Sequence, residues 1–305
     1  MPLTPANPPQ ALRQAFDEAL YLQLNDDVAT AVRVGEIASG WEHFFAYGIF
    51  EGRPGSPLGI EPQNRFSTPP VHLRKRVHGD TSESSFLLDG QKIALDLDDA
   101  VARLDYQFPP NAEALDFGCG CGRVLSWLRL FRPAFRYTGS DIDAEAVMWC
   151  MQNLPFGTFL HSPSRPPTKF ADSHFDFVFS VSVFTHLPEQ LQFMWLDELR
   201  RITKPGGYLA LSIASETAFD DWMARREGRN FLRRMIAVRK NGRELKARGF
   251  TYGIATRTAG LPAFYRAAFH SHAYVKEHWS RFFSIHNVIP RGINEHQDLV
   301  ICRRD

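Results

Sequence analysis

The sequence predicts an α/β protein built on a doubly wound, mostly parallel sheet. Between residues 112 and 213, short apolar runs of strand type alternate with helical patterns, and such alternation is typical of a parallel sheet covered by helices on both faces. A glycine-rich turn, Gly118-Cys-Gly-Cys-Gly122, joins the first apolar run to a helical pattern. Near the end of the chain, residues 282–289 and 299–302 have the pattern of strands and predict a terminal antiparallel pair.

The strands and helices of this sheet can be placed from residue type and periodicity. Strands are expected where β-branched and aromatic residues cluster, and helices where apolar residues recur every three or four positions. The expected strands cover residues 114–117, 136–140, 157–160, 175–181 and 207–213. The expected helices cover residues 91–104, 124–131, 144–153 and 189–202, and a loop is expected around residues 69–77.

The chain divides into three parts. Residues 1–57 are expected to form a helical N-terminal module and a linker, because Gly52-Arg-Pro-Gly-Ser-Pro57 is rich in turn residues. Residues 58–111 precede the main domain and carry a helix that we expect to cap the site. Residues 112–305 form the α/β domain, in which residues 214–281 are the predicted substrate-side insertion.

Composition argues against several classes of protein. A chain of 305 residues with 44% hydrophobic content can bury one large core and a small appendage. The net charge of +1 argues against a nucleic-acid partner and against an anionic membrane surface. Four cysteines do not make a disulfide framework, and Cys119 and Cys121 lack further metal ligands nearby. The N-terminus lacks the pattern of a secretory signal, so we expect a soluble, cytoplasmic protein without a bound metal.

The glycine turn is the most informative feature of the sequence. Gly118, Gly120 and Gly122 follow an apolar run that ends in Asp116. We expect this turn to expose backbone amides where an anionic ligand group can meet them. A dinucleotide site has the spacing G-x-G-x-x-G, whereas this chain has G-x-G-x-G with an acid two residues before the first glycine. The difference favours S-adenosylmethionine over a nicotinamide cofactor.

A second acidic cluster follows the next expected strand. Asp141 comes about 20 residues after the turn, where an ionised carboxylate suits the two hydroxyls of a ribose. Ile142 would then lie beside a flat base. Asp143 is better interpreted as the N-cap of the following helix, whose first turn also carries Glu145. Because ligands of doubly wound sheets bind at the carboxyl ends of the strands, the glycine turn and Asp141 should face one site.

Four segments in this order resemble the class I S-adenosylmethionine-dependent methyltransferases. They are Leu115-Asp-Phe-Gly-Cys-Gly-Cys-Gly122, Gly139-Ser-Asp141, Phe175-Asp-Phe-Val178 and Leu199-Arg-Arg-Ile-Thr-Lys-Pro-Gly-Gly207. The resemblance covers residues 112–213 and implies S-adenosyl-L-methionine as the cofactor. With the N-terminal helices added, the predicted fold is a Rossmann-like methyltransferase sheet with a small N-terminal helical extension.

The resemblance also implies roles for individual residues. Asp116 and the glycine turn would hold the methionine part of the cofactor, and Asp141 would bind the ribose hydroxyls. Ser180 or Val181 would line the floor of the site. The family often has an acid after the third strand, where it meets the adenine amino group. This chain has Phe159-Leu-His-Ser-Pro-Ser164 there, which leaves the adenine contact open.

Methyl transfer requires few catalytic groups from a protein, because a sulfonium methyl group is already electrophilic. The enzyme mainly aligns the donor with the nucleophile and excludes water. A hydroxyl nucleophile usually needs a base, and histidine is the usual choice near neutral pH. His186 is the first candidate for that base, followed by His270 and His272, and a structural role is the alternative for each.

These expectations lead to O-methylation of a small molecule or a glycan. The alternatives are a cofactor-binding scaffold protein without catalysis and a nicotinamide-dependent oxidoreductase, which the glycine spacing disfavours. Residues 11–53 have helical patterning and resemble modules fused to bacterial glycosyltransferases and other polysaccharide-related proteins, which implies association with glycan-synthesis proteins. The alternative is a helical cap over apolar surface, since Trp41 and Phe45 need burial or a partner.

Overall fold

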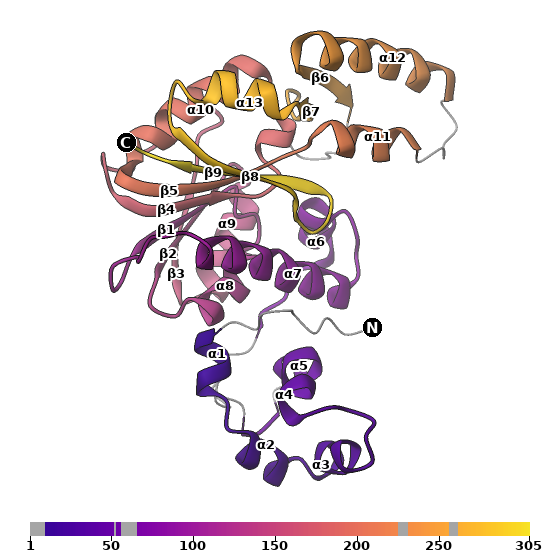
Figure 1. Cartoon of the computed structure of the whole chain (residues 1–305), viewed down its shortest axis with the longest axis vertical. Helices are drawn as coiled ribbons and strands as arrows, with labels where there is room; N and C mark the ends of the chain where they lie inside the picture. Colours follow the sequence, from indigo (N-terminus) through magenta and orange to yellow (C-terminus); the bar gives the residue numbers. More distant parts are fainter. Residues whose placement is uncertain (1–9, 52, 56–65, 225–230, 256–261) are drawn as a thin grey trace.

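A seven-stranded sheet with the strand order β3-β2-β1-β4-β5-β9-β8 forms the centre of the protein (Figure 1). The computed structural model describes residues 10–51, 53–55, 66–224, 231–255 and 262–305. The strands of this sheet are β1 (Glu113–Phe117), β2 (Arg136–Asp141), β3 (Gly157–His161), β4 (Phe175–Ser180), β5 (Thr203–Ile213), β8 (Ser284–Ile293) and β9 (Gln297–Arg303). Strands β1 to β5 run parallel, whereas β9 is antiparallel to β5 and β8 is antiparallel to β9. The predicted doubly wound sheet with a terminal antiparallel pair is confirmed.

The order of the strands reverses at β1. This strand pairs in parallel with β2 on one side and with β4 on the other. The segments that leave β1 and β4 at their carboxyl ends therefore diverge, and ligands of open α/β sheets bind in the crevice that results. All six residues of β4 are buried, as expected for the centre of a parallel sheet.

Helices cover both faces of the sheet (Figure 1). One face packs against α7 (Glu83–Ala102), α8 (Leu125–Phe131) and α9 (Ala144–Asn153), and the other against α10 (Glu189–Ile202) and α13 (His272–Trp279). Trp127 is fully buried on the first face and Trp279 on the second. Helices α9 and α10 begin and end where the periodicity predicted. Within the described ranges, no helix is long and apolar enough to cross a membrane.

Two helices differ from the expectation, one in where it begins and one in being present at all. Helix α7 begins at Glu83 rather than at residue 91, and the hydroxyl of Ser82 caps it by accepting a hydrogen bond from Ser85 N at 3.2 Å. The segment expected to be a loop contains α6 (Val71–His78), which starts directly after Pro70. Few apolar residues in α6 face the core, so periodicity gives little signal there.

The terminal hairpin also differs from the expectation. The first of the two terminal strands was expected to end at residue 289, but β8 continues through Pro290 to Ile293. The turn lies at residues 294–296, where Asn294 and Glu295 have φ angles of 49° and 57°. Two successive residues with positive φ are typical of tight hairpin turns.

The N-terminal region is a small group of helices packed on α7 and α8. They are α1 (Gln10–Ala15), α2 (Glu18–Leu24), α3 (Asp26–Arg33), α4 (Gly40–His43) and α5 (Ile49–Glu51), with a π-helical turn at Phe44–Gly48. The Phe45 ring lies 6.4 Å from the Phe131 ring of α8, and Gln91 of α7 donates to Phe45 O at 3.1 Å. Trp41 and Phe45 are therefore both buried. The predicted boundary at residue 57 lies outside the described residues, and the resemblance to modules of glycan-synthesis proteins stays a prediction.

A further group of elements is inserted between β5 and β8. It contains α11 (Glu216–Ala224), α12 (Phe231–Arg248), β6 (Phe250–Ala255) and β7 (Arg266–His270), and is followed by α13. Strands β6 and β7 form a separate antiparallel sheet. His270 N donates to Ala214 O at 2.9 Å, which ties this group to the carboxyl end of β5. Figure 1 shows it at the end of the main sheet opposite the N-terminal helices.

Candidate functional site

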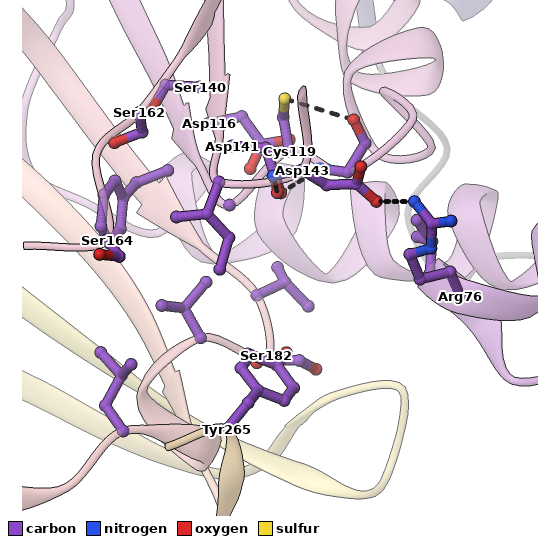
Figure 2. A pocket seen from close by; sticks show the side chains of 18 of the residues that line it. Arg76, Asp116, Cys119, Ser140, Asp141, Asp143, Ser162, Ser164, Ser182 and Tyr265 are labelled. Atoms are coloured by element: carbon purple, nitrogen blue, oxygen red, sulfur yellow. Dashed lines mark hydrogen bonds and ion pairs between the residues drawn. The ribbon is translucent and has the colours of Figure 1, made fainter. Parts of the chain in front are cut away.

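A cavity of about 140 Å³ opens at the carboxyl ends of β1, β2 and β4. It has two chemically different halves (Figure 2). The polar half is formed by Asp116, Gly118, Gly120, Arg123, Ser140, Asp141, Ile142, Ser162 and Ser164. The apolar half is formed by Val181, Ser182, Val183, Leu187, Trp195, Phe264 and Tyr265. Arg76 and Val77 of α6 also line the cavity.

The glycine turn brings the backbone of β1 close to its neighbours. Gly118, Gly120 and Gly122 have φ angles of 88°, 53° and 67°, which other residues rarely adopt. A Cβ atom on Gly118 would lie 2.2 Å from Cγ2 of Val183, and both residues line the cavity. A Cβ atom on Gly122 would lie 2.4 Å from Cδ1 of Leu154, behind the cavity wall. The first glycine therefore shapes the cavity, and the third allows the packing of α9.

Four backbone amides of the turn, those of residues 118, 119, 120 and 122, are already paired within the protein. Gly118 N and Cys119 N donate to Ser140 O at 2.8 and 3.1 Å. Gly120 N donates to Asp141 Oδ2 at 2.7 Å, and Gly122 N donates to Cys119 O at 2.9 Å. These four amides are therefore not free to meet an anionic ligand group in the way that was expected of the turn. A pyrophosphate-binding turn needs free amides, so the geometry disfavours a dinucleotide.

Asp141 links the end of β2 to the glycine turn. Its Oδ2 accepts from Gly120 N at 2.7 Å, and its Oδ1 accepts from Asp143 N at 2.8 Å. Burial raises the pKa of Asp141, although these backbone hydrogen bonds oppose the shift. Asp143 caps α9 by accepting from the amides of Glu145 and Ala146, as predicted.

A buried acid and a buried cation lie together in the polar half. Burial and the nearby charge of Asp141 raise the pKa of Asp116 well above its usual range, and the Arg123 guanidinium opposes this shift. Arg123 Nη1 donates to His78 Nδ1 at 2.8 Å. Among the described residues, buried Arg123 Nε has no hydrogen-bond partner. The polar half thus presents a cation beside acids that a bound ammonium group would help to ionise, which suits a zwitterionic ligand.

Comparison with known proteins identifies a domain within the chain. Residues 115–211 match the family described as a methyltransferase domain. The chain contains a methyltransferase domain. The matched range runs from β1 to β5 and includes the glycine turn, Asp141 and most of the cavity wall. S-adenosylmethionine is the cofactor of this family.

The methyltransferase domain is also similar to individual proteins. It is 35% identical over 97 residues to a fatty-acid O-methyltransferase of Mycolicibacterium smegmatis, covering 31% of this chain and 34% of that protein. It is 32% identical over 114 residues to a probable phthiotriol/phenolphthiotriol dimycocerosates methyltransferase of Mycobacterium ulcerans, covering 36% of this chain and 43% of that protein. The chain thus spans less than half of these relatives. A solved S-adenosylmethionine-dependent methyltransferase of Methanosarcina mazei has 22% identity and a TM-score of 0.43, covering 66% of this chain and 99% of that chain.

Most residues predicted to bind the cofactor line the cavity of the methyltransferase domain. These are Asp116, Gly118, Gly120, Asp141, Ile142 and Val181. Gly122 and Ser180 are not among the lining residues. Gly122 instead allows close packing against Leu154, and Ser180 is fully buried within β4.

The three histidines considered as a base do not line the cavity. His186 lies behind Tyr265, with the two rings stacked at 4.2 Å and 18°, and burial lowers the pKa of His186 to about 4. His270 is fully buried, and its Nε2 lies 2.9 Å from Gln192 Oε1. His272, at the start of α13, has its Nε2 atom 2.5 Å from Asp298 Oδ2. The expectation of a catalytic histidine at these positions is therefore not supported by the geometry.

Several lining residues were missed by sequence reasoning. Arg123 directly follows the third glycine. A charged residue next to a turn that is expected to lie at the ligand site could have been predicted to line that site. Phe264 and Tyr265 carry no motif, and they reach the methyltransferase domain through the insertion. Ser182 lies in the loop after β4, and its local sequence does not distinguish it from its neighbours.

We expect Gly118→Ala to lower the free energy of unfolding by about 2–4 kcal/mol. A side chain at this φ costs about 1–2 kcal/mol, and the clash with Val183 adds about as much again. Gly35→Ala is the matched control, because Gly35 has a φ of 77° and nothing within 4 Å of its Cβ position. Urea denaturation of both variants measures the difference. Equal losses in the two variants would contradict the close approach of Gly118 to Val183.

Proposed function

We propose that this protein is an S-adenosylmethionine-dependent methyltransferase that acts on an oxygen atom of a small, largely apolar molecule. The observation that carries the proposal is the two-sided cavity, in which a charged polar half adjoins an aromatic half. A cofactor in the polar half would present its methyl group to a molecule in the apolar half. The matched methyltransferase domain supplies all the residues named for the polar half.

The polar half fits each part of the cofactor. The Asp116 carboxylate would pair with its ammonium group, and the Arg123 guanidinium with its carboxylate. Asp141 would accept hydrogen bonds from the ribose hydroxyls, beside Ile142 at the adenine. Ser162 Oγ is buried and has no hydrogen-bond partner among the described residues, so it can accept from the adenine amino group. This serine stands where the family often has an acid.

The bound cofactor supplies an electrophilic methyl group. The chain then has to hold the acceptor in line with that group and keep water out. Val183 and Tyr265 form apolar walls beside Gly118 and Ser182. These walls favour a compact apolar acceptor, because a glycan would need several polar side chains to replace the water around its hydroxyls. The similarity to a fatty-acid O-methyltransferase supports oxygen as the methylated atom.

Binding of S-adenosylhomocysteine, measured by isothermal titration calorimetry, tests the cofactor. We expect a Kd in the micromolar range, which corresponds to a binding free energy of about −8 kcal/mol. We expect no change in NADH fluorescence on mixing. Transfer of labelled methyl groups to a panel of carboxylic acids, phenols and sugar nucleotides tests the reaction. Binding of NADH instead would favour the oxidoreductase, and cofactor binding without transfer to any acceptor would favour the scaffold. Transfer of the methyl group to sugars would instead indicate that the acceptor is a glycan.

A further inference from the structure

Ser182 has an unusual backbone that three other elements hold in place. It directly follows β4 and has a φ of 62°, in the left-handed region that favours glycine. Ser182 N donates to Ser212 Oγ of β5 at 2.8 Å. Ser182 O accepts from Tyr265 Oη at 3.3 Å, and Ser182 Oγ accepts from Gln297 Nε2 of β9 at 2.6 Å. Strained residues that their surroundings hold in this way concentrate at functional sites.

The hydroxyl proton of Ser182 is available to a ligand. Because the Gln297 amide donates to Ser182 Oγ, that oxygen acts as an acceptor toward Gln297 and keeps its own O–H for another partner. Ser182 lines the cavity, and Figure 2 shows it beside Tyr265. The Tyr265 hydroxyl is directed to Ser182 O. Ser182 therefore offers the apolar half a hydroxyl proton that its contacts with Gln297 and Tyr265 do not use.

The same half offers no base near neutral pH among its described residues. Its lining side chains are aliphatic, aromatic or hydroxyl-bearing. Burial raises the pKa of Tyr265, so its hydroxyl stays protonated. His186 lies behind Tyr265 and has a pKa of about 4. An acceptor that arrives already ionised needs no base, and a carboxylate is ionised at neutral pH.

We propose that the acceptor is an apolar carboxylic acid and that the Ser182 hydroxyl donates a hydrogen bond to its carboxylate. This inference rests on the proposed function. One carboxylate oxygen accepts from Ser182 while the other attacks the methyl carbon. The new O–CH₃ bond forms as the S–CH₃ bond breaks, and the electron pair of the broken bond stays on sulfur. No proton moves, and the products are a methyl ester and S-adenosylhomocysteine. Gln297 is a positioning residue that orients the Ser182 hydroxyl.

Matched acids and alcohols test the acceptor class. The probes are octanoic, dodecanoic and 3-phenylpropionic acids and the primary alcohols with the same apolar bodies, each with S-adenosylmethionine at pH 7.5. We expect methyl esters from the acids and turnover of the alcohols at least about a hundredfold slower, as a tenfold change corresponds to about 1.4 kcal/mol. Comparable turnover of alcohols, or cofactor binding with no ester from any acid, would overturn this inference.

Ser182→Gly tests the hydrogen bond without disturbing the backbone, because glycine accepts the positive φ. We expect the KM for the acid to rise about tenfold or more, as for a lost hydrogen bond to a charged group, with unchanged binding of S-adenosylhomocysteine. Gln297→Glu should also raise KM, because a carboxylate only accepts and would take up the Ser182 proton. An unchanged KM in Ser182→Gly overturns the inference.

The control is Ser173→Gly, since Ser173 has a φ of 50° but lies before β4, at the other end of the strand. Ser173 Oγ accepts from Arg304 Nη1 at 3.0 Å, away from the cavity. We expect its KM to match that of the unaltered protein, and a rise equal to that of Ser182→Gly would overturn the inference. If the unaltered protein does not bind S-adenosylhomocysteine, the proposed function itself has failed.

Discussion

Asp141→Ala should weaken the binding of S-adenosylhomocysteine at least about a hundredfold, since two lost hydrogen bonds to a charged group are worth about 3–6 kcal/mol. The carboxylate of Asp141 would bind both hydroxyls of the ribose. It also accepts from Gly120 N and Asp143 N, so its removal leaves two backbone donors unpaired next to the ligand. The site would lose both its contact with the ribose and the shape of the glycine turn.

Calorimetry on the variant and the unaltered protein measures the change in affinity. The affinity of Asp141→Asn for S-adenosylhomocysteine should fall between those of Asp141→Ala and the unaltered protein, because one oxygen remains as an acceptor. The control is Asp172→Asn, since Asp172 is an exposed acid that pairs with Arg201 at the surface. If Asp141→Ala lowers the affinity by less than about threefold, which is under 1 kcal/mol, Asp141 does not bind the cofactor.

Asp116→Asn should weaken cofactor binding above neutral pH, flatten its dependence on pH and stabilise the free protein. Burial and Asp141 raise the pKa of Asp116 in the folded protein. A carboxyl group with a raised folded pKa stabilises the fold most below its unfolded pKa, and that contribution is lost as the pH rises through the folded pKa. The cofactor ammonium pairs with the ionised form, so affinity in the unaltered protein should increase as the pH rises.

Titrations between pH 5.5 and pH 8 measure this dependence, and thermal unfolding of the free protein measures the stability. At the upper end we expect Asp116→Asn to bind about 10–100-fold more weakly, as for loss of a charge-assisted hydrogen bond. Its melting temperature without cofactor should be higher than that of the unaltered protein. Asp172→Asn should keep the pH slope. A slope in Asp116→Asn equal to that of the unaltered protein would exclude Asp116 as the group that titrates with binding.

Local signals explain which elements were predictable. Helices α9 and α10 match their expected bounds because their apolar periodicity and flanking residues are confined to a few turns of chain. Helix α6 was missed because its sequence is mostly basic, and it is held to the domain by contacts that are distant in sequence. Arg76 Nη1, for example, donates to Asp143 Oδ2 at 2.6 Å.

By itself, the sequence determined the sheet, the glycine turn and the acids Asp116 and Asp141. Each of these lies at or next to the end of a strand, and a parallel topology alone brings such ends together. Only the tertiary structure decided that four of the turn amides are paired within the protein and that His186 lies behind Tyr265. It also brought Tyr265 to Ser182, 83 residues away. Such hydrogen-bond partners and side-chain neighbours depend on packing between distant segments, which no local pattern encodes.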